Sequence, residues 1–275
     1  MRKGRPSLTA HVMAAVRAGL TNQGLLADNY AWIFARPPIR LLARLVRTPL
    51  RNLPLLREMV GNVAGRTLLF DRQLSQALES GIAQVVILGA GYDSRSYRFS
   101  RSDTQFVEVD IAETQVAKVR RLERSGIDVS DVSFLAVDFE TESLHERLGE
   151  LLDATRPTFF VWEGVVEYLP EDAVRQTLRD LSRVAGPKSQ LVFDLPHASS
   201  ECSKIVDFAS RSLSRLLGEP KGVAMEPDTL EQLLRDEGWR TAAVFEITQL
   251  HDEYFSKVVY RAPTPHNYYV LAVPI

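Results

Sequence analysis

Cysteine is almost absent from this sequence of 275 residues: Cys202 is the only one, so no disulfide can form within the chain. Long apolar runs are also missing, and none approaches the roughly 20 residues that a membrane-spanning helix needs. The basic start, residues 1–6, leads into no apolar segment of the signal-peptide kind. These absences exclude a disulfide scaffold and predict a cytoplasmic protein without stable membrane insertion.

The composition is otherwise that of an ordinary globular protein, with 45% apolar and 25% charged residues. The five histidines have no ligand spacing with one another or with a cysteine, so we expect no metal. We predict one domain over residues 1–275. It has an N-terminal helical cap (1–62) and an α/β core (63–275), with a helical insertion near 196–222.

The two signs of charge are unevenly distributed along the chain. Residues 1–66 hold eleven basic and two acidic side chains, whereas the remainder carries an excess of acidic residues. Within the basic part, Arg40, Arg44 and Arg47 fall on one face of a predicted short amphipathic helix. These arginines can form either a solvated helix face or a rim that attracts anions.

Beyond residue 81, short apolar runs alternate with helical stretches such as 113–125, 143–152 and 171–184. Runs that are apolar at every position suit strands covered on both faces. The predicted strands are Gln84–Leu88, Gln105–Val109, Val132–Val137, Thr158–Trp162, Gln190–Phe193, Thr241–Thr248 and Asn267–Val273. The alternation predicts a Rossmann-like, doubly wound, mostly parallel α/β sheet. The last two strands have no helix between them, so we expect antiparallel neighbours at one sheet edge.

The first predicted strand leads into Gly89, Ala90 and Gly91. In doubly wound sheets the ligand lies beyond the carboxyl ends of the strands, and glycines there let the backbone approach it closely. Ser94 occupies the place of the third glycine of the dinucleotide fingerprint. This loop alone is compatible with either a dinucleotide or an adenosyl cofactor.

Acidic residues end the next three strands in succession. Glu108 and Asp110 point the same way at the second strand, so either can accept from the hydroxyls of a ribose. Asp138 follows the third strand, and Glu163 follows the fourth. Such a series favours a cationic, hydroxyl-rich ligand without phosphate, and S-adenosyl-L-methionine has these properties.

These motifs together resemble the leucine carboxyl methyltransferase family, and specifically its tetracenomycin-type polyketide carboxyl O-methyltransferases. The resemblance is carried by 65–67 (Gly-Arg-Thr), 84–99 with its Gly89-Ala90-Gly91-Tyr92-Asp93-Ser94-Arg95 loop, 106–110, 137–139 and 162–170. It implies a class I methyltransferase fold and an S-adenosyl-L-methionine-dependent O-methyltransferase. The implied acceptor is a carboxyl group of a small molecule such as a polyketide or other secondary metabolite.

The resemblance also implies a role for each matching residue. Gly89, Ala90 and Gly91 would line the cofactor. Asp110 would hold its ribose, and Asp138 with Phe139 its adenine. Glu163 would take the methionine ammonium and Arg66 the methionine carboxylate, as a bidentate guanidinium–carboxylate pair. Asp93, Arg95 and Arg98 are expected to fix the loop by local hydrogen bonds.

Three positions depart from the family's pattern. Phe139 replaces the usual leucine, which a backbone contact would tolerate. Gln23 stands near the place where phosphatase-directed members carry lysine, which argues against a protein C-terminus as the acceptor. Glu167 occupies a usually apolar position and can either face solvent or add a carboxylate to the acceptor pocket.

A carboxylate acceptor is already ionised at neutral pH and needs no general base. A hydroxyl acceptor would be helped by one, and His197 is then the first candidate. Glu167 comes second, and Tyr168 beside it completes the candidate catalytic residues. A basic cap over an acidic body would suit an anionic acceptor.

Three alternatives stay open on sequence alone. An NAD(P)-dependent oxidoreductase shares the glycine loop and the acid at the end of the second strand. A nucleic-acid methylase would need an Asp/Asn-Pro-Pro-aromatic motif where residues 163–165 read Glu-Gly-Val, and the acidic body repels phosphate, so no nucleic-acid partner is expected. The third is a binding module that has kept the fold without the activity.

Overall fold

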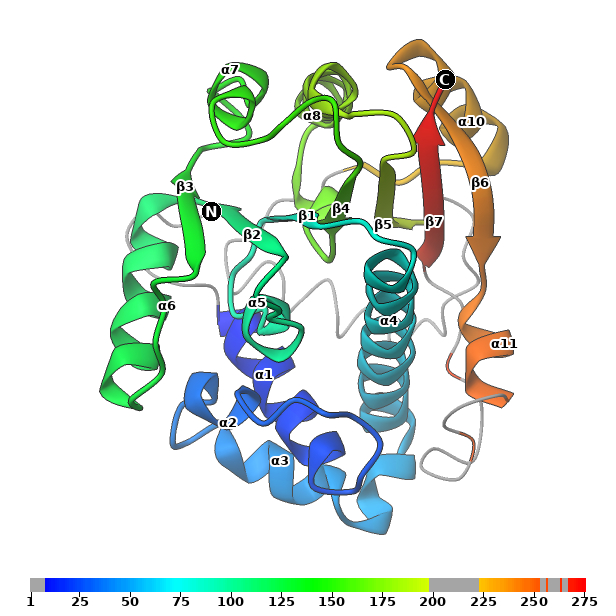
Figure 1. Cartoon of the computed structure of the whole chain (residues 1–275). Helices are drawn as coiled ribbons and strands as arrows, with labels where there is room; N and C mark the ends of the chain where they lie inside the picture. Colours follow the sequence, from blue (N-terminus) through cyan, green and yellow to red (C-terminus); the bar gives the residue numbers. More distant parts are fainter. Residues whose placement is uncertain (1–7, 198–222, 253–255, 257–262, 264–266) are drawn as a thin grey trace.

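The computed structural model describes residues 8–197, 223–252, 256, 263 and 267–275. Its centre is a seven-stranded sheet in the order β3-β2-β1-β4-β5-β7-β6 (Figure 1). The strands are β1 (Gln84–Leu88), β2 (Gln105–Asp110), β3 (Val132–Ala136), β4 (Thr158–Trp162), β5 (Gln190–Pro196), β6 (Trp239–Phe245) and β7 (Asn267–Pro274). All seven predicted strands are present, which confirms the doubly wound sheet.

Strands β1 to β5 pair in parallel, and β7 runs antiparallel to both β5 and β6. The expected antiparallel pair at one edge is therefore confirmed, with β7 inside and β6 outermost. The sixth strand begins two residues earlier than predicted, because Trp239 is buried and its indole N–H donates to the Leu178 carbonyl (2.8 Å). Thr248 lies instead in a short helix.

Helices cover both faces of the sheet. The described helices are α1 (Leu8–Thr21), α2 (Ala31–Phe34), α3 (Arg40–Val46), η1 (Pro49–Asn52), α4 (Pro54–Glu79), α5 (Arg95–Arg98), α6 (Ala112–Arg124), α7 (His145–Gly149), η2 (Val166–Tyr168), α8 (Glu171–Val184), α10 (Pro227–Asp236) and α11 (Ile247–Leu250). Helices α1, α4 and α11 pack on one face, and α7, α8 and α10 on the other. Neighbouring strand residues such as Val85 and Val86 belong to opposite cores.

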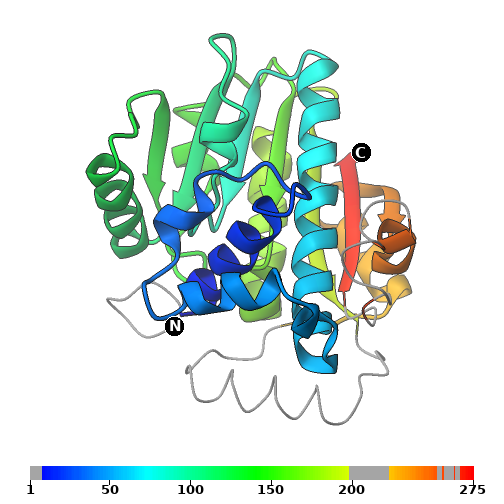
Figure 2. The same ribbon diagram turned by 90° about the horizontal axis from the view of Figure 1, so that it is seen from below.

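The helices of the N-terminal cap gather beyond the carboxyl ends of the central strands (Figures 1 and 2). The short amphipathic helix predicted around residues 40–47 is α3. Helix α4 starts at Pro54, nine residues before the predicted start of the α/β core at residue 63, because proline suits the first turn of a helix. Because α4 runs through residue 62, it belongs to both the cap and the core. The division between cap and core at that residue stays a prediction. Most of the predicted insertion, and Cys202, lie outside the described residues.

A buried histidine ties the cap to the loop after β1. The His11 ring is fully buried, with Nδ1 2.6 Å from the Phe34 carbonyl oxygen and Nε2 3.4 Å from the Tyr92 hydroxyl. That carbonyl can only accept, so Nδ1 carries the proton. Burial, with a smaller contribution from nearby Arg36 and Arg121, lowers the pKa of His11 to about 4.

We expect this histidine to make folding sensitive to acid. In the unfolded chain its pKa is near 6.5, so protons bind the unfolded state first as the pH falls. Neutral His11 therefore contributes its full share of the free energy of unfolding above pH 6.5. As the pH falls from 6.5 to 4 this share is lost, and the free energy of unfolding decreases by about 3 kcal/mol. Urea unfolding at a series of pH values should show a flatter dependence for His11→Gln. Parallel curves for the two proteins would contradict this expectation.

Candidate functional site

Asp110 ends β2 and holds the loop that follows β1. One carboxylate oxygen accepts from the Gly91 N–H (2.6 Å), and the other accepts from the Ile111 N–H (2.7 Å). Burial raises the pKa of Asp110, and these two donors act against that rise. A carboxylate can accept about four hydrogen bonds, so Asp110 keeps acceptor capacity at the edge of the loop.

Glu108, two residues earlier on the same strand, has a different surrounding. It is fully buried, and its Oε2 lies 2.6 Å from Nζ of Lys118, a lysine that is itself buried. From strand alternation alone, Glu108 and Asp110 are equal candidates for holding a ribose, but the structure gives them different partners. Glu108 neutralises a lysine inside the protein, and Asp110 adjoins the glycine loop.

The two glycines of the loop are required for different reasons. Gly89 has φ +61°, and a Cβ atom there would lie 2.3 Å from Cγ2 of Val165. Val165 follows β4, so the loops after β1 and β4 are in direct contact. Gly91 has φ +40°, but a Cβ would meet only the Gly89 carbonyl oxygen, at 3.7 Å. Close packing therefore demands glycine at 89, and backbone conformation alone favours it at 91.

We expect Gly89→Ala to lower the free energy of unfolding by about 2–4 kcal/mol, because it combines overpacking with a strained φ. Adding Val165→Ala removes the clashing methyl group and should restore about half of the loss. Gly91→Ala, the matched control, should cost only about 1 kcal/mol. Urea denaturation measures all three. A Gly89→Ala protein as stable as the wild type would show that Val165 does not occupy this space.

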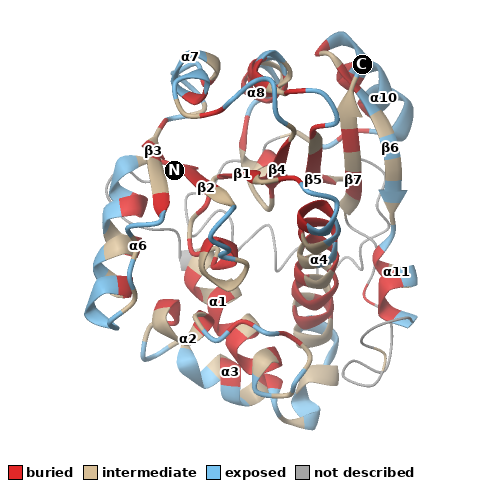
Figure 3. Ribbon diagram, in the orientation of Figure 1, coloured by how far each residue is buried: buried red, intermediate tan, exposed pale blue. Residues whose placement is uncertain are grey.

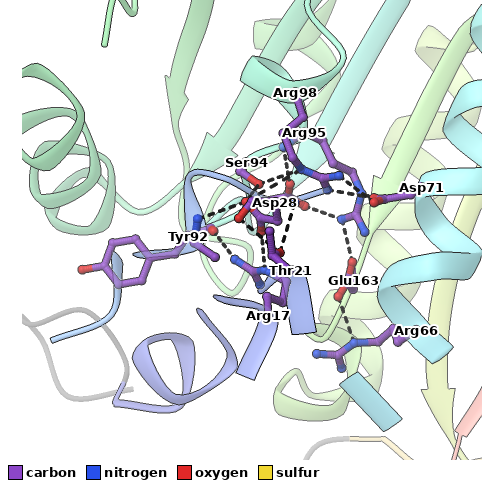
Figure 4. A network of polar contacts seen from close by, with 12 residues as sticks. Arg17, Thr21, Asp28, Arg66, Asp71, Tyr92, Ser94, Arg95, Arg98 and Glu163 are labelled. Atoms are coloured by element: carbon purple, nitrogen blue, oxygen red, sulfur yellow. Dashed lines mark hydrogen bonds and ion pairs between the residues drawn. The ribbon is translucent and has the colours of Figure 1, made fainter. Parts of the chain in front are cut away.

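Glu163 follows β4 and lies between two arginines (Figure 4). Its carboxylate is 2.9 Å from Nε of Arg66, on α4, and 2.6 Å from Nη1 of Arg95, which opens α5. Burial alone would raise the pKa of Glu163, but Arg95 and Arg66 outweigh it and hold this pKa below its usual value. The two residues that the resemblance assigns to the methionine end are therefore in direct contact.

Asp194, on β5, is a member of the site that the sequence analysis missed. It accepts from Nη1 of Arg66 (3.3 Å), from the Gly164 N–H (2.6 Å) and from the side-chain amide of Asn267 (2.9 Å). It thus joins α4, β5, β7 and the loop after β4. The signal was present in the sequence, since Asp194 is one more acid near the end of a parallel strand.

The N-terminal cap reaches the same place through Arg17 and Asp28. Arg17 pairs with Asp28 (2.8 Å) and donates to the Tyr92 carbonyl oxygen (2.6 Å). The Ser94 hydroxyl donates to Asp28 (2.8 Å), which explains a serine in place of the third dinucleotide glycine. No local pattern marked Arg17 or Asp28, because the residues after β1 that they contact, Tyr92 and Ser94, lie more than 60 residues away along the chain.

These groups belong to one connected set, which we call the arginine–carboxylate network (Figure 4). Arg95 and Arg98 share Asp71 from α4, and Arg95 also pairs with Asp93. The predicted loop-fixing role of Asp93, Arg95 and Arg98 therefore extends to Glu163. The members are Arg17, Arg66, Arg95, Arg98, Asp28, Asp71, Asp93, Glu163 and Asp194. Five carboxylates face four guanidinium groups, so one negative charge is left over.

The remaining sequence candidates come from the segments that follow β3, β4 and β5. Asp138 is exposed and accepts from the Glu140 N–H (3.0 Å). Phe139 is half-buried, with its ring centroid 6.4 Å from that of Trp162 at the end of β4. Both follow β3, the strand beside β2, and so flank Asp110 from the next strand.

Glu167 and Tyr168 lie in η2, after β4, and both are half-buried. Burial lowers the pKa of the Arg66 guanidinium, but Glu163 and Asp194 outweigh it and raise this pKa above its usual value. Glu167 is close enough to Arg66 to add a smaller part of the rise. The half-buried Glu167 is therefore partly accessible to solvent, and its place in an acceptor pocket stays a prediction. His197 pairs with Met225 in an isolated bridge, and its ring lies 4.4 Å from that of Tyr268.

Comparison with solved structures defines the class of the fold. The chain resembles a Thermobifida fusca protein described as a methyltransferase, with TM-score 0.61 and 16% identity, over 99% of this chain and 96% of that one. It also resembles magnesium protoporphyrin IX methyltransferase from Synechocystis with bound S-adenosylhomocysteine, with TM-score 0.53 and 12% identity, over 94% and 98% of the two chains. The fold is that of the class I methyltransferases.

The model of the leucine carboxyl methyltransferase family matches residues 9–182. A Mycobacterium marinum relative, whose name assigns it to the S-adenosyl-L-methionine-dependent methyltransferases, is 31% identical over 73% of this chain and 64% of its own length. This chain therefore belongs to the leucine carboxyl methyltransferase family, a family of S-adenosyl-L-methionine-dependent methyltransferases. The match leaves about a third of that relative's length uncovered.

Membership confirms the expected family. As expected, S-adenosyl-L-methionine is the cofactor of that family and methyl transfer is its enzyme class. The tetracenomycin-type branch and the nature of the acceptor remain predictions. Among the described residues, no helix is long and apolar enough to cross a membrane. Within the same residues, no three metal-binding side chains gather at one point.

Proposed function

We propose that this protein is an S-adenosyl-L-methionine-dependent O-methyltransferase that acts on the carboxyl group of a small molecule, such as a polyketide or other secondary metabolite. The observation that carries the proposal is the Arg66–Glu163 pair beside the glycine loop held by Asp110. It offers an anion and a cation side by side, as the amino-acid end of the cofactor requires.

The charge of the network supports this assignment. S-adenosylmethionine carries a sulfonium, an ammonium and a carboxylate, and hence one net positive charge, which matches the surplus negative charge of the network. Glu163 would pair with the methionine ammonium and Arg66 with the methionine carboxylate. Each would give up part of its present ion pair with the other for this new interaction. Dinucleotide phosphates would instead meet this surplus negative charge, which disfavours the oxidoreductase alternative.

The other proposed contacts follow the order of the strands. Asp110 would accept from the ribose hydroxyls, and the backbone at Gly89, Ala90 and Gly91 would approach the cofactor closely. Asp138 and Phe139, beside Trp162, would hold the adenine. The cofactor supplies the methyl group on a positively charged sulfur.

The chemical step is an in-line displacement at the methyl carbon. An acceptor carboxylate oxygen forms the new C–O bond while the S–CH3 bond breaks. The electron pair of the broken S–CH3 bond stays on sulfur. The products are a methyl ester and S-adenosylhomocysteine, and no proton moves. This chain would contribute alignment of the two reactants and exclusion of water. We propose in addition that the acceptor is anionic and that the enzyme acts in the cytoplasm.

The test uses methyl-labelled cofactor with fractionated extract of the source organism, and mass spectrometry of the labelled product. Mild alkali releases methanol from a methyl ester but leaves a methyl ether intact, so hydrolysis separates carboxyl from hydroxyl acceptors. We expect labile label and unchanged turnover in His197→Gln. Alkali-stable label together with loss of turnover in that variant would favour a hydroxyl acceptor with His197 as base.

A further inference from the structure

A cluster of exposed leucines lies on the cap, away from the candidate site. The described residues contain seven large apolar side chains that are exposed, and four of them fall within fifteen residues: Leu41 (59% exposed), Leu50 (47%), Leu53 (53%) and Leu55 (56%). Leu41 lies on α3, Leu50 on η1 and Leu55 in the first turn of α4, and Leu53 is the residue between η1 and α4. Helix η1 contacts both α3 and α4. Isolated exposed leucines are ordinary in proteins, whereas four on adjoining short elements make this region a candidate interaction surface.

Arginines interleave with these leucines, and no acid accompanies them. Between Asp28 and Glu58 the chain has six arginines and no acidic residue. Arg40, Arg44 and Arg47 are exposed. Arg40 lies over the Trp32 ring, 5.9 Å from its centroid, and donates to the Ala35 carbonyl oxygen (3.0 Å). Within the described residues, neither Arg44 nor Arg47 forms an ion pair.

The leucine–arginine face consists of Leu41, Leu50, Leu53, Leu55, Arg40, Arg44 and Arg47. Its elements form the end of the molecule that is lowest in Figure 1 and turned toward the viewer in Figure 2. Figure 3 shows exposed positions along α3 and at the start of α4. The face lies well away from the site, because Leu55 and Arg66 are eleven residues, or about 17 Å, apart along α4.

We propose that the leucine–arginine face docks on the surface of an anionic lipid membrane. Leucines can enter the boundary between headgroups and acyl chains while arginines meet lipid phosphates, as in helices that lie in a membrane interface. A second copy of this chain would bring the same uncompensated arginines against each other, so charge disfavours self-association. The inference does not rest on the proposed catalytic function.

The test is sedimentation of the full chain with vesicles of phosphatidylcholine, with or without phosphatidylglycerol. We expect binding only to the anionic vesicles, weakened as ionic strength rises. Arg44→Glu with Arg47→Glu should reduce binding at least tenfold, since each arginine near such a surface contributes about a fivefold change. Leu53→Ser with Leu55→Ser should reduce it to a similar extent.

Matched controls lie on β6, where Val244→Ser and Arg240→Glu make the same chemical changes at exposed positions outside the face. They should bind vesicles within twofold of the wild type, and melting temperatures will show that all variants are folded. Equal binding to neutral vesicles, or no loss in both double variants, would overturn the proposal. So would a dimer in light scattering that the leucine variant dissociates, because a second copy would then cover the face.

Discussion

Asp110→Ala is expected to weaken the binding of S-adenosylhomocysteine at least about 100-fold while the protein stays folded. The substitution removes the acceptor proposed for two ribose hydroxyls, and hydrogen bonds to a charged group contribute about 1.5–3 kcal/mol each. It also releases the Gly91 N–H, so the glycine loop loses its anchor. Isothermal titration calorimetry measures the affinity, and circular dichroism follows the fold.

Glu108→Gln is the matched control, because it changes the other carboxylate on the same face of β2. It leaves the buried Lys118 ammonium without its counter-charge, so the free energy of unfolding should fall by about 3–5 kcal/mol. Cofactor affinity at a temperature where the variant is folded should change little. If Asp110→Ala bound the ligand as tightly as the wild type, the ribose assignment would be wrong.

Arg66→Met is expected to weaken S-adenosylhomocysteine binding by about 100-fold and to leave 5′-methylthioadenosine binding within about threefold. The second ligand lacks the amino-acid end, so only the first loses a charge-assisted pair. Removal of the guanidinium should leave Glu163 paired with Arg95, and Asp194 bonded to Gly164 and Asn267. Loss of the ion pair therefore need not unfold the site.

Arg66→Lys adds a graded control, because lysine keeps the charge but loses the planar pair of donors. It should fall between the wild type and Arg66→Met for S-adenosylhomocysteine. Competition binding with both ligands gives the two affinities for each variant. An equal loss for 5′-methylthioadenosine would mean that Arg66 supports the pocket as a whole and does not recognise the methionine carboxylate.

Much of the sheet could be predicted because each parallel strand contains a short run of mostly apolar residues. In β1 and β4 all residues are buried, so burial on both faces dictated the pattern that the sequence displays. The boundaries of β6 were less accurate, since in this edge strand exposed residues alternate with residues that are mostly only half-buried. The predicted division between cap and core at residue 62 falls inside α4, which begins at Pro54, because a proline can either interrupt a helix or begin one.

The sequence named candidate site residues mainly where they adjoin strand ends. Gly89, Gly91, Asp110 and Glu163 were named in this way and Arg66 through the family resemblance, and their contacts with the cofactor remain predictions. Asp28 and Asp71 were not predicted, because they contact Ser94 and Arg98 in a segment far from them along the chain, and a single sequence without a fold carries no sign of such pairings. The charge division of the chain also has a structural meaning now. Arg17 and Arg66 belong to the network, whereas Arg44 and Arg47 lie on the exposed face.

The central claim is that the ends of β1, β2 and β4 hold S-adenosylmethionine, and calorimetric titration of the full chain with S-adenosylhomocysteine tests it most directly. The account predicts saturable binding of one molecule per chain, with no detectable binding of NAD under the same conditions. Saturable binding of NAD without binding of S-adenosylhomocysteine would contradict it.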